Sequence, residues 1–285
     1  MQRPLPSFLR TRWAEGTRAT ALGCALLVLA GCAGILPPTA PQATPWPERL
    51  HTLLPADVLL LGEQHDAPDH QRIHLEAVQA LAAHGQLAAL VLEMAEQGHS
   101  TTGLPASASP TEVQTALQWN DAGWPWAAYG PAVMAAVQAG VPVLGANLPR
   151  TQMRAAMANA QLDGQLPGPA LKAQQQAIRL GHCGLLPESQ IAPMTRIQIA
   201  RDQAMAQTLQ AAAVPGKTVL LLAGAGHVDT SLGIPQYLPP NFLSKTVLLL
   251  VESAQAAPKS IVNFDSIWRT PRIPPTDYCA TIQPQ

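Results

Sequence analysis

Short apolar runs that alternate with helical stretches constrain the fold of this chain more than any other feature of its sequence. The segment 68–83 has apolar residues at helical spacing, and it lies between two runs that have the length of buried strands. Strands that alternate with helices predict an α/β fold, with a mostly parallel sheet and helices on both faces. The apolar runs are residues 57–61, 87–92, 141–146, 218–222 and 246–251.

The remaining segments fit one domain over residues 49–285. Residues 149–213 have little strand character and predict three helices, the last and longest over 194–213, so we interpret this stretch as a helical insertion. A further helix is expected to start near Pro131, because proline suits the first turn of a helix. Residues 260–264 predict an edge strand.

The first 31 residues predict a bacterial lipoprotein signal peptide. Four arginines precede an apolar run of about a dozen residues, which is short for a membrane span. The run ends in Leu29-Ala30-Gly31-Cys32, which resembles the lipobox, in which the cysteine is lipidated and becomes the first residue of the mature protein. The alternative is a signal anchor with a chance cysteine.

The residues after Cys32 predict where the domain lies. Residues 32–48 are rich in proline and predict a stiff tether. Ala33 follows the lipidation site, and a small neutral residue there is usual in lipoproteins sorted to the outer membrane. The resemblance to bacterial lipoproteins therefore implies a lipid anchor in the bacterial outer membrane, with the domain facing the periplasm.

Charge and cysteine content narrow the partners and the compartment. The chain has a net charge of −1; without residues 1–31, which hold four arginines and one glutamate, 13 basic and 17 acidic side chains remain, a net charge of −4. This mildly acidic balance gives no sign of a nucleic-acid partner. Cys183 and Cys279 are the cysteines left beyond Cys32, and in an oxidising compartment they predict a disulfide. The alternative is two free thiols.

Polar side chains follow four of the predicted strands, at the sheet edge where α/β folds bind ligands. Two of these side chains are histidines, each the last residue of a Gly-x-x-His segment, at Gly62–His65 and Gly224–His227. A glycine directly after a buried strand permits a sharp turn, so we expect two equivalent turns to bring both imidazoles to one cleft. The side chains at this edge are Glu63, His65, Glu93, Asn147, Arg150 and His227.

These motifs together resemble a known family. GEQH, VLEM, ANLPR, RDQAMA and GAGHV followed by GIPQYL are similar to the ChaN family of haem-binding lipoproteins, over about residues 50–253. That family belongs to a superfamily with the Tiki metalloproteases and the erythromycin-esterase-like enzymes. The resemblance implies a haem-binding lipoprotein of iron acquisition, with a homodimer partner or a haem receptor.

The resemblance leaves two ligands open. The residues that would bind haem are His65, His227, Tyr129, Arg150 and His70. Tyr129 corresponds to a Tyr-x-Pro element of the family, and a phenolate can ligate haem iron. The alternative for Tyr129 is a packed side chain whose hydroxyl is hydrogen-bonded within the protein. Arg150 would hold a propionate as a bidentate donor. The chain has no Cys-x-x-Cys-His segment, which argues against covalent haem.

The Tiki branch of the superfamily implies a different site. There, His65, Glu93 and His227 would bind a divalent metal ion, and Glu63 would be the general base of a hydrolase. A third interpretation is a lipoprotein that binds a protein partner and whose haem or metal site is vestigial.

Overall fold

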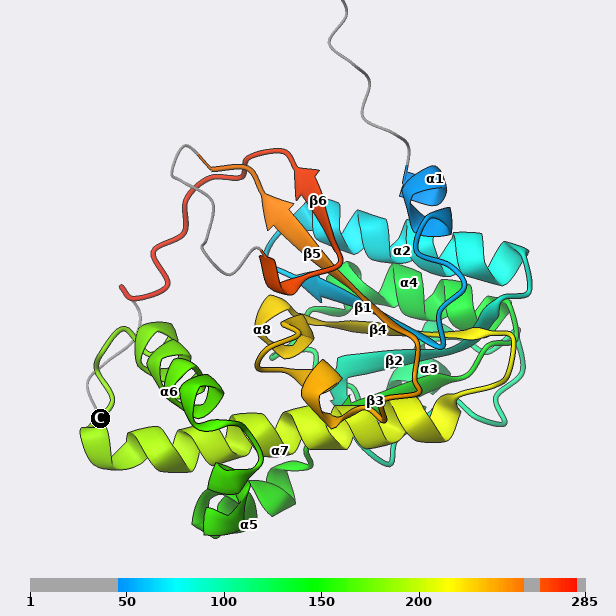
Figure 1. Ribbon diagram of the computed structural model, residues 1–285. Coiled ribbons are helices and arrows are strands. Elements are labelled where there is room, and N and C mark those ends of the chain that lie inside the picture. The colour runs from blue at the N-terminus through cyan, green and yellow to red at the C-terminus, as the bar shows by residue number, and fades with distance from the viewer. Residues whose placement is uncertain (1–45, 254–261, 281–285) are drawn as a thin grey trace, which may run out of the picture. The chain divides into compact units, whose positions relative to one another are not determined.

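The structure of the chain is a computed structural model that describes residues 46–253 and 262–280 (Figure 1). The predicted signal peptide, Cys32 and nearly all of the predicted tether lie outside the described residues, so those predictions stay untested. Within the described ranges, no helix is both long enough and apolar enough to cross a membrane.

Six parallel strands form one sheet in the order β3-β2-β4-β1-β5-β6 (Figure 1). The predicted α/β class is therefore confirmed. β1 and β4 lie side by side at the centre, and both are buried along their whole length. The strands are β1 Val58–Glu63, β2 Leu87–Glu96, β3 Val143–Asn147, β4 Thr218–Gly224, β5 Ser244–Val251 and β6 Ser266–Thr270.

Alternating side chains of the central strands build a core on each face of the sheet. Leu59, Leu61 and Leu220 face the helices α2 (Pro68–Ala83) and α4 (Trp126–Gln138). Their sequence neighbours, such as Leu60 and Leu221, face the long helix α7 (Glu188–Ala212). Both faces are apolar because helices cover both, as expected for a parallel sheet. Two short helices, α1 (Trp46–His51) and α3 (Pro110–Ala116), complete the α2 side.

Two helices begin earlier than the sequence predicts. α4 starts at Trp126 and contains Pro131, because the Asp121 carboxylate accepts a hydrogen bond from Trp126 N (2.7 Å) and holds an extra turn before the proline. α7 starts at Glu188, directly after Pro187, and contains Pro193. In both cases a proline lies inside the helix, and the helix is longer than the predicted one.

The predicted insertion contains three α-helices, and the last is the longest, as expected. Its elements form a small core of their own with α7, around Leu148, Leu162 and Ile199. They are η1 (Arg150–Gln152), α5 (Met153–Ala158), η2 (Ala160–Gly164), α6 (Gly168–Gly181) and α7.

The edge strand lies later than predicted. Residues 262–265 form a turn, and β6 covers Ser266–Thr270. Asp265 fixes this turn, because its Oδ2 accepts hydrogen bonds from the backbone N (2.8 Å) and hydroxyl (2.9 Å) of Thr246 on β5. The strand prediction was therefore wrong for residues 262–264, whereas residues 260 and 261 lie outside the described residues.

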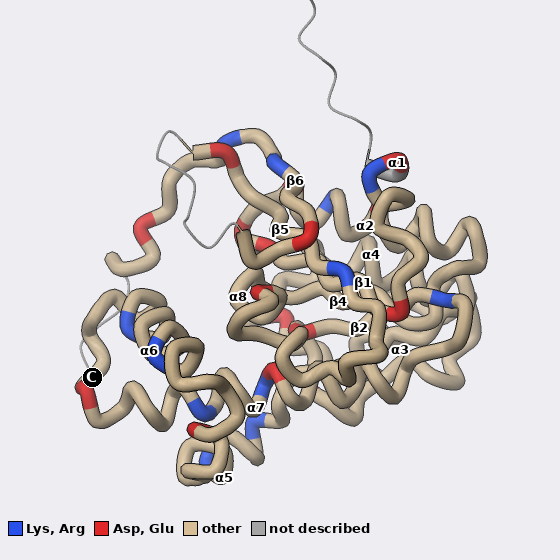
Figure 2. Tube along the Cα trace, viewed as in Figure 1, with Lys and Arg blue, Asp and Glu red and all other residues tan. Residues whose placement is uncertain are grey.

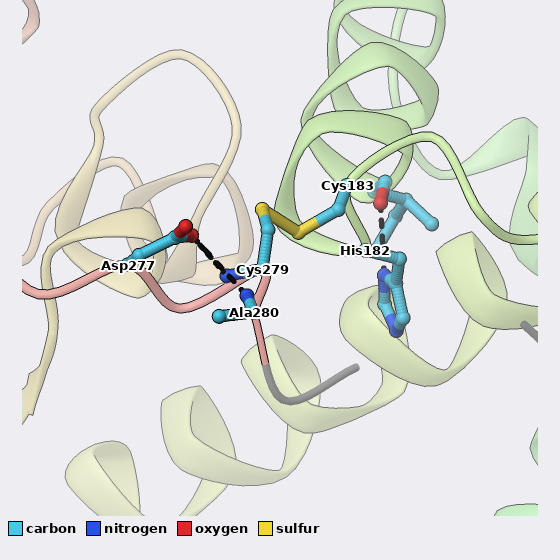
Figure 3. Close-up of a disulfide and its surroundings, with 6 residues drawn as sticks. His182, Cys183, Asp277, Cys279 and Ala280 are labelled. Atoms are coloured by element: carbon cyan, nitrogen blue, oxygen red, sulfur yellow. Dashed lines mark hydrogen bonds between the residues drawn. A yellow bond between two sulfur atoms is a disulfide. The ribbon is translucent and has the colours of Figure 1, made fainter. Parts of the chain in front are cut away.

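A disulfide joins Cys183, after α6, to Cys279 in the C-terminal tail, as predicted (Figure 3). The tail also contacts the turn after β1, where the hydroxyl of Tyr278 donates to Asp66 (2.6 Å) and Gln64 donates to that hydroxyl (3.2 Å). The disulfide thus joins the tail to the insertion, and the Tyr278 hydrogen bonds join it to the turn that carries His65.

Replacing both cysteines by serine should lower the free energy of unfolding. Closing a loop of 96 residues stabilises by up to about 4–5 kcal/mol in the chain-entropy model, and engineered cases often give less. Urea unfolding of the wild type with and without reductant measures the effect, and the double variant should not respond to reductant. A wild-type midpoint that reductant leaves unchanged would contradict the prediction.

Candidate functional site

The two Gly-x-x-His segments are not equivalent in the structure. Glu63 pairs with Gly224 across β1 and β4, so the two motifs are offset by one residue in the sheet register. β1 leads into an open turn that carries His65, whereas β4 leads directly into the helical turn α8 (Ala225–Val228), which carries His227. The His65 side chain is 42% exposed and that of His227 is 7% exposed. The expected equivalence is therefore wrong.

Each glycine makes room for the other motif. A Cβ on Gly62 would lie 3.0 Å from Cα of Ala225 and 3.1 Å from Cβ of Val228, both in α8. A Cβ on Gly224 would lie 2.9 Å from Nε2 of His65. Gly62 leaves room for the backbone of α8, whereas a side chain at position 224 would require the half-exposed His65 ring to shift. This close approach brings the two histidines to one edge of the sheet.

Glu63 fixes the orientation of His65 from below. Its Oε1 lies 2.7 Å from Nδ1 of His65 and accepts a 2.7 Å hydrogen bond from the Tyr129 hydroxyl. Its Oε2 lies 3.6 Å from Nδ1 of the fully buried His74. Trp124 makes a T-shaped contact with the His65 ring, with the ring centroids 4.8 Å apart. The His65 imidazole is thus held between a buried carboxylate and an indole.

His227 lies between two buried carboxylates, those of Glu93 and Asp202. Its Nε2 lies 3.2 Å from Oε1 of Glu93, and its Nδ1 lies 2.5 Å from Oδ1 of Asp202 on α7. The other oxygen of Glu93 accepts from the backbone N of Gly224 (2.7 Å). This Asp202–His227–Glu93 chain joins α7, α8 and β2.

Ion pairing outweighs burial at His227, Glu93 and Glu63, whereas burial dominates at Asp202. Burial alone would lower the pKa of His227, but Glu93 and Asp202 raise it to about 10. Burial alone would raise the pKa of Glu93, but His227 and then His65 lower it to about 2. For Asp202, burial dominates and raises the pKa to about 6. Burial also opposes ionisation of Glu63, yet the neighbouring histidines and Tyr129 lower its pKa below the ordinary value.

A cavity of about 590 Å³ opens above these buried groups, at the carboxyl ends of β1, β2 and β3. Its wall combines apolar side chains with two arginines, Arg150 and Arg201, and two histidines, His65 and His99. Charged residues are otherwise scattered along the described chain, without a long block of one sign (Figure 2). The other side chains of the wall include Glu93, Met94, Glu96, Gln118, Asn120, Trp124, Asn147, Leu148 and Met153.

Sequence reasoning did not identify Arg201 as a ligand contact. It lies on α7, next to Asp202, and its buried Nε has no hydrogen-bond partner within the described residues. In the sequence, Arg201 is one of several polar residues on a predicted helix. Its local sequence does not show that this part of the helix lies beside the cavity. Arg150, in contrast, was predicted and lines the cavity.

Four predicted site residues lie outside the cavity wall. Tyr129 is 2% exposed and binds Glu63, so the predicted phenolate contact with iron is not available in this geometry. His70 is fully buried and holds Gln64 N and the Thr270 hydroxyl with its two ring nitrogens, which is a structural role. Glu63 and His227 lie beneath the wall and support it, so Glu63 is not placed as a general base for a ligand in the cavity.

The residues predicted for a divalent metal do not fit one. Within residues 46–253 and 262–280, no group of three or more His, Cys, Asp or Glu side chains is arranged to hold a metal ion. Both Glu93 oxygens and both His227 nitrogens are already engaged with each other, with Gly224 N and with Asp202. Glu93 and His227 therefore serve the fold of the site, and we derive no metal chemistry from them.

Comparisons with known proteins agree with the motif resemblance. The family model described as "Haem-binding uptake, Tiki superfamily, ChaN" matches residues 49–238. Among solved structures, ChaN of Campylobacter jejuni, in a structure titled "Cofacial heme binding to ChaN of Campylobacter jejuni", is 25% identical. The match covers 74% of this chain and 87% of that one with a TM-score of 0.59. No curated protein sequence matches significantly.

Two bacterial effectors show weaker structural likeness. The type III effector HopBA1 is 16% identical, over 76% of this chain and 88% of that one, with a TM-score of 0.44. RRSP, a MARTX toxin effector domain from Vibrio vulnificus CMCP6, is 14% identical, over 79% of this chain and 40% of that one, with a TM-score of 0.42.

Gly224→Ala should disturb the site by pushing His65 out of its place. The added Cβ would meet Nε2 of His65 at 2.9 Å, so the half-exposed ring has to shift, and the loss of stability should be at or below the low end of the about 1–3 kcal/mol that overpacking of a closed core costs. Gly226→Ala is the matched control, since a Cβ there meets nothing within 4 Å. Urea unfolding and the NMR signals of the histidine rings would measure both effects. Equal behaviour of the two variants would refute the packing argument.

The stability of the protein should fall as the pH rises through the alkaline range. The pKa of His227 is raised from 6.5 to about 10, so the folded protein holds this proton more tightly than the unfolded chain does. The resulting stabilisation is complete below about pH 6.5, declines between 6.5 and 10, and is lost above about pH 10. The raised pKa of Asp202, about 6, acts below this window.

Urea unfolding at the two ends of that window checks the prediction. The wild type should lose on the order of a few kcal/mol between them, and His227→Gln should show a shallower dependence. The same slope in both proteins would show that the His227 ion pairs do not contribute.

Proposed function

The chain belongs to the haem-binding uptake (ChaN) family of the Tiki superfamily, and we propose that it is an outer-membrane lipoprotein that binds haem for iron acquisition. The observation that carries the proposal is the cavity at the carboxyl edge of the sheet. It unites apolar and cationic side chains in one wall, as an amphipathic ligand with carboxylate groups requires.

The volume of the cavity and the apolar part of its lining support haem as the ligand. Its volume of about 590 Å³ falls in the usual range for small-molecule and cofactor sites, about 300–1,000 Å³. Trp124, Met94, Leu148 and Met153 offer apolar contacts for a porphyrin ring. The haem group, when bound, supplies an iron centre, and the role proposed for this chain is to hold it and not to react with it.

Two arginines support the assignment of the haem carboxylates. Arg150 is exposed at the start of η1 and Arg201 comes from the opposite element, α7, and both line the same cavity. Guanidinium groups bind carboxylates with paired, charge-assisted hydrogen bonds. The Nε of Arg201 is buried without a partner in the described part of the chain, which favours a ligand anion as its partner. We therefore assign the propionates to Arg150 and Arg201.

The membrane part of the proposal rests on the sequence. Cys32 ends a lipobox-like segment, and the proline-rich residues between it and Trp46 would form the tether that leads to α1. An anchored domain of this kind would face the periplasm, where the proposed partners are haem and either a second copy of the chain or a haem receptor. The disulfide fits an oxidising compartment.

Haemin titration of the mature chain tests the binding site. Arg150→Ala and Arg201→Ala should each weaken saturable haemin binding, on the order of 10-fold, because each removes charge-assisted hydrogen bonds. Arg154→Ala is the control, since Arg154 is exposed on α5 and does not line the cavity. The change in the Soret band measures the affinity. No saturable change with the wild type would overturn the proposal.

Cell fractionation tests the anchor separately. Cys32→Ala should leave the membrane fraction or remain uncleaved, because the lipidated residue is lost. The wild type should fractionate with the outer membrane. Normal membrane retention of the Cys32→Ala protein would rule out the proposed lipidation.

A further inference from the structure

The C-terminal tail connects two parts of the chain that both line the cavity. Residues 271–280 follow β6, contain no helix or strand, and lie beyond the residues that the family model matches. The disulfide joins the tail to Cys183, directly after α6, and α6 shares a small core with α7, which carries Arg201. Hydrogen bonds join the tail to the turn that carries His65. The tail therefore spans from the insertion to the turn after β1.

The contacts between the tail and the turn lie on both sides of His65 in the sequence. The Tyr278 hydroxyl donates to Oδ2 of Asp66 (2.6 Å) and accepts from Nε2 of Gln64 (3.2 Å). The Thr276 hydroxyl donates to the same oxygen of Asp66 (3.3 Å), and Gln64 also donates to Oδ1 of Asp66 (2.9 Å). The tail and the turn thus form one hydrogen-bonded cluster around the backbone of His65.

These hydrogen bonds depend on the disulfide to keep the tail in place. All of them are exposed, and an exposed hydrogen bond contributes little by itself because water competes for both partners. The Cys183–Cys279 bond tethers the tail beside the turn, so the tail groups have a high effective concentration there. Without the tether, the same groups would exchange their partners for water.

The disulfide itself is open to solvent. Cys279 is exposed and Cys183 is half-buried, and the bond lies on the surface beside the end of α6 (Figure 3). Exposed disulfides are the ones that dithiols reach and reduce, whereas buried structural disulfides resist reduction. The bond therefore combines access for a reductant with a mechanical connection to the turn at the cavity.

We propose that the Cys183–Cys279 bond is a redox clasp, which a dithiol opens to release the tail from the turn and so weaken ligand binding in the cavity, while the domain stays folded. A thiolate of the dithiol attacks one sulfur of the bond and forms a mixed disulfide, and its second thiolate then displaces this sulfur. The protein gains two electrons and two protons as two thiols, and the dithiol becomes a disulfide. Only the effect on the ligand rests on the proposed haem binding.

Hydrogen exchange followed by NMR tests the release of the tail without any ligand. The reporters are the backbone amides of Gln64 and Ala67, which are hydrogen-bonded within the turn to Nδ1 of His70 (3.0 Å) and to O of Gln64 (3.1 Å). Reduction of the mature chain by dithiothreitol should speed exchange at both amides, whereas the amides of β1 and β4 should stay protected. Thiol labelling establishes that both cysteines are reduced.

The variant with both Cys183→Ser and Cys279→Ser is the control for the reductant. Its turn amides should exchange fast with and without dithiothreitol, and circular dichroism should show a folded domain. Unchanged exchange at the turn on reduction, or an equal increase throughout the sheet, refutes the clasp.

Tyr278→Phe tests whether the disulfide acts through the tail contacts. This variant keeps the disulfide and removes the hydroxyl that binds Asp66 and Gln64, so the turn amides should exchange fast already in the oxidised protein. Reduction should then add little, because both changes remove the same contact. Thr52→Val is the matched control, since it removes another exposed hydroxyl hydrogen bond, to O of Arg49 (2.7 Å), and should respond to reduction like the wild type. Full additivity in Tyr278→Phe refutes the clasp.

Haemin titration without reductant tests the effect on the ligand. The double serine variant should bind haemin more weakly than the oxidised wild type, on the order of 5-fold or more, the size of a typical coupling between two sites. No saturable haemin binding by the wild type refutes the proposed function and with it the effect on the ligand, whereas hydrogen exchange decides the release of the tail by itself. Equal haemin affinities of the two proteins refute the effect of the clasp on the cavity and leave the proposed function standing.

Discussion

The close approach of the segments that follow β1 and β4 is the constraint on which the site depends. Gly62 leaves room for α8, and Gly224 leaves room for the imidazole of His65. A side chain at either position would meet atoms of the other segment at about 3 Å. Because these two strands pair at the centre of the sheet, this contact sets where both histidines lie relative to β2 and to the cavity.

The site has two layers with different electrostatic roles. The lower layer holds ionised groups away from water, and each is compensated: His227 lies between Glu93 and Asp202, and Glu63 binds His65 and Tyr129. Buried ion pairs add little net stability, but loss of one partner leaves an uncompensated charge, so such pairs fix one arrangement of their elements. The upper layer, with Trp124, Arg150 and Arg201, remains available to a ligand.

Much of the fold could be predicted from the local pattern of apolar residues in the sequence. The candidate site could be predicted from that pattern only in part. The five apolar runs and the helix over 68–83 are visible in the sequence because burial on both faces leaves continuous apolar strands. The separation of the two Gly-x-x-His segments into an exposed and a buried histidine depends on a one-residue register offset between strands far apart in the chain. The role of Arg201 could not be predicted from local pattern either, because its contact with the cavity depends on where α7 packs in the fold. The starts of α4 and α7 were missed because prolines inside both helices resemble boundaries.

The Cys183–Cys279 bond also changes the connectivity of the molecule. Together with 96 residues of backbone it closes a covalent ring that contains α7, β4, α8, β5 and β6. A single proteolytic cut anywhere inside this ring leaves both products joined as one molecule, and the central strand β4 cannot be separated from the rest. A chain cut once inside the ring would thus keep all parts of its site in one molecule. The ring keeps the chain covalently connected after a cut at any one peptide bond within it.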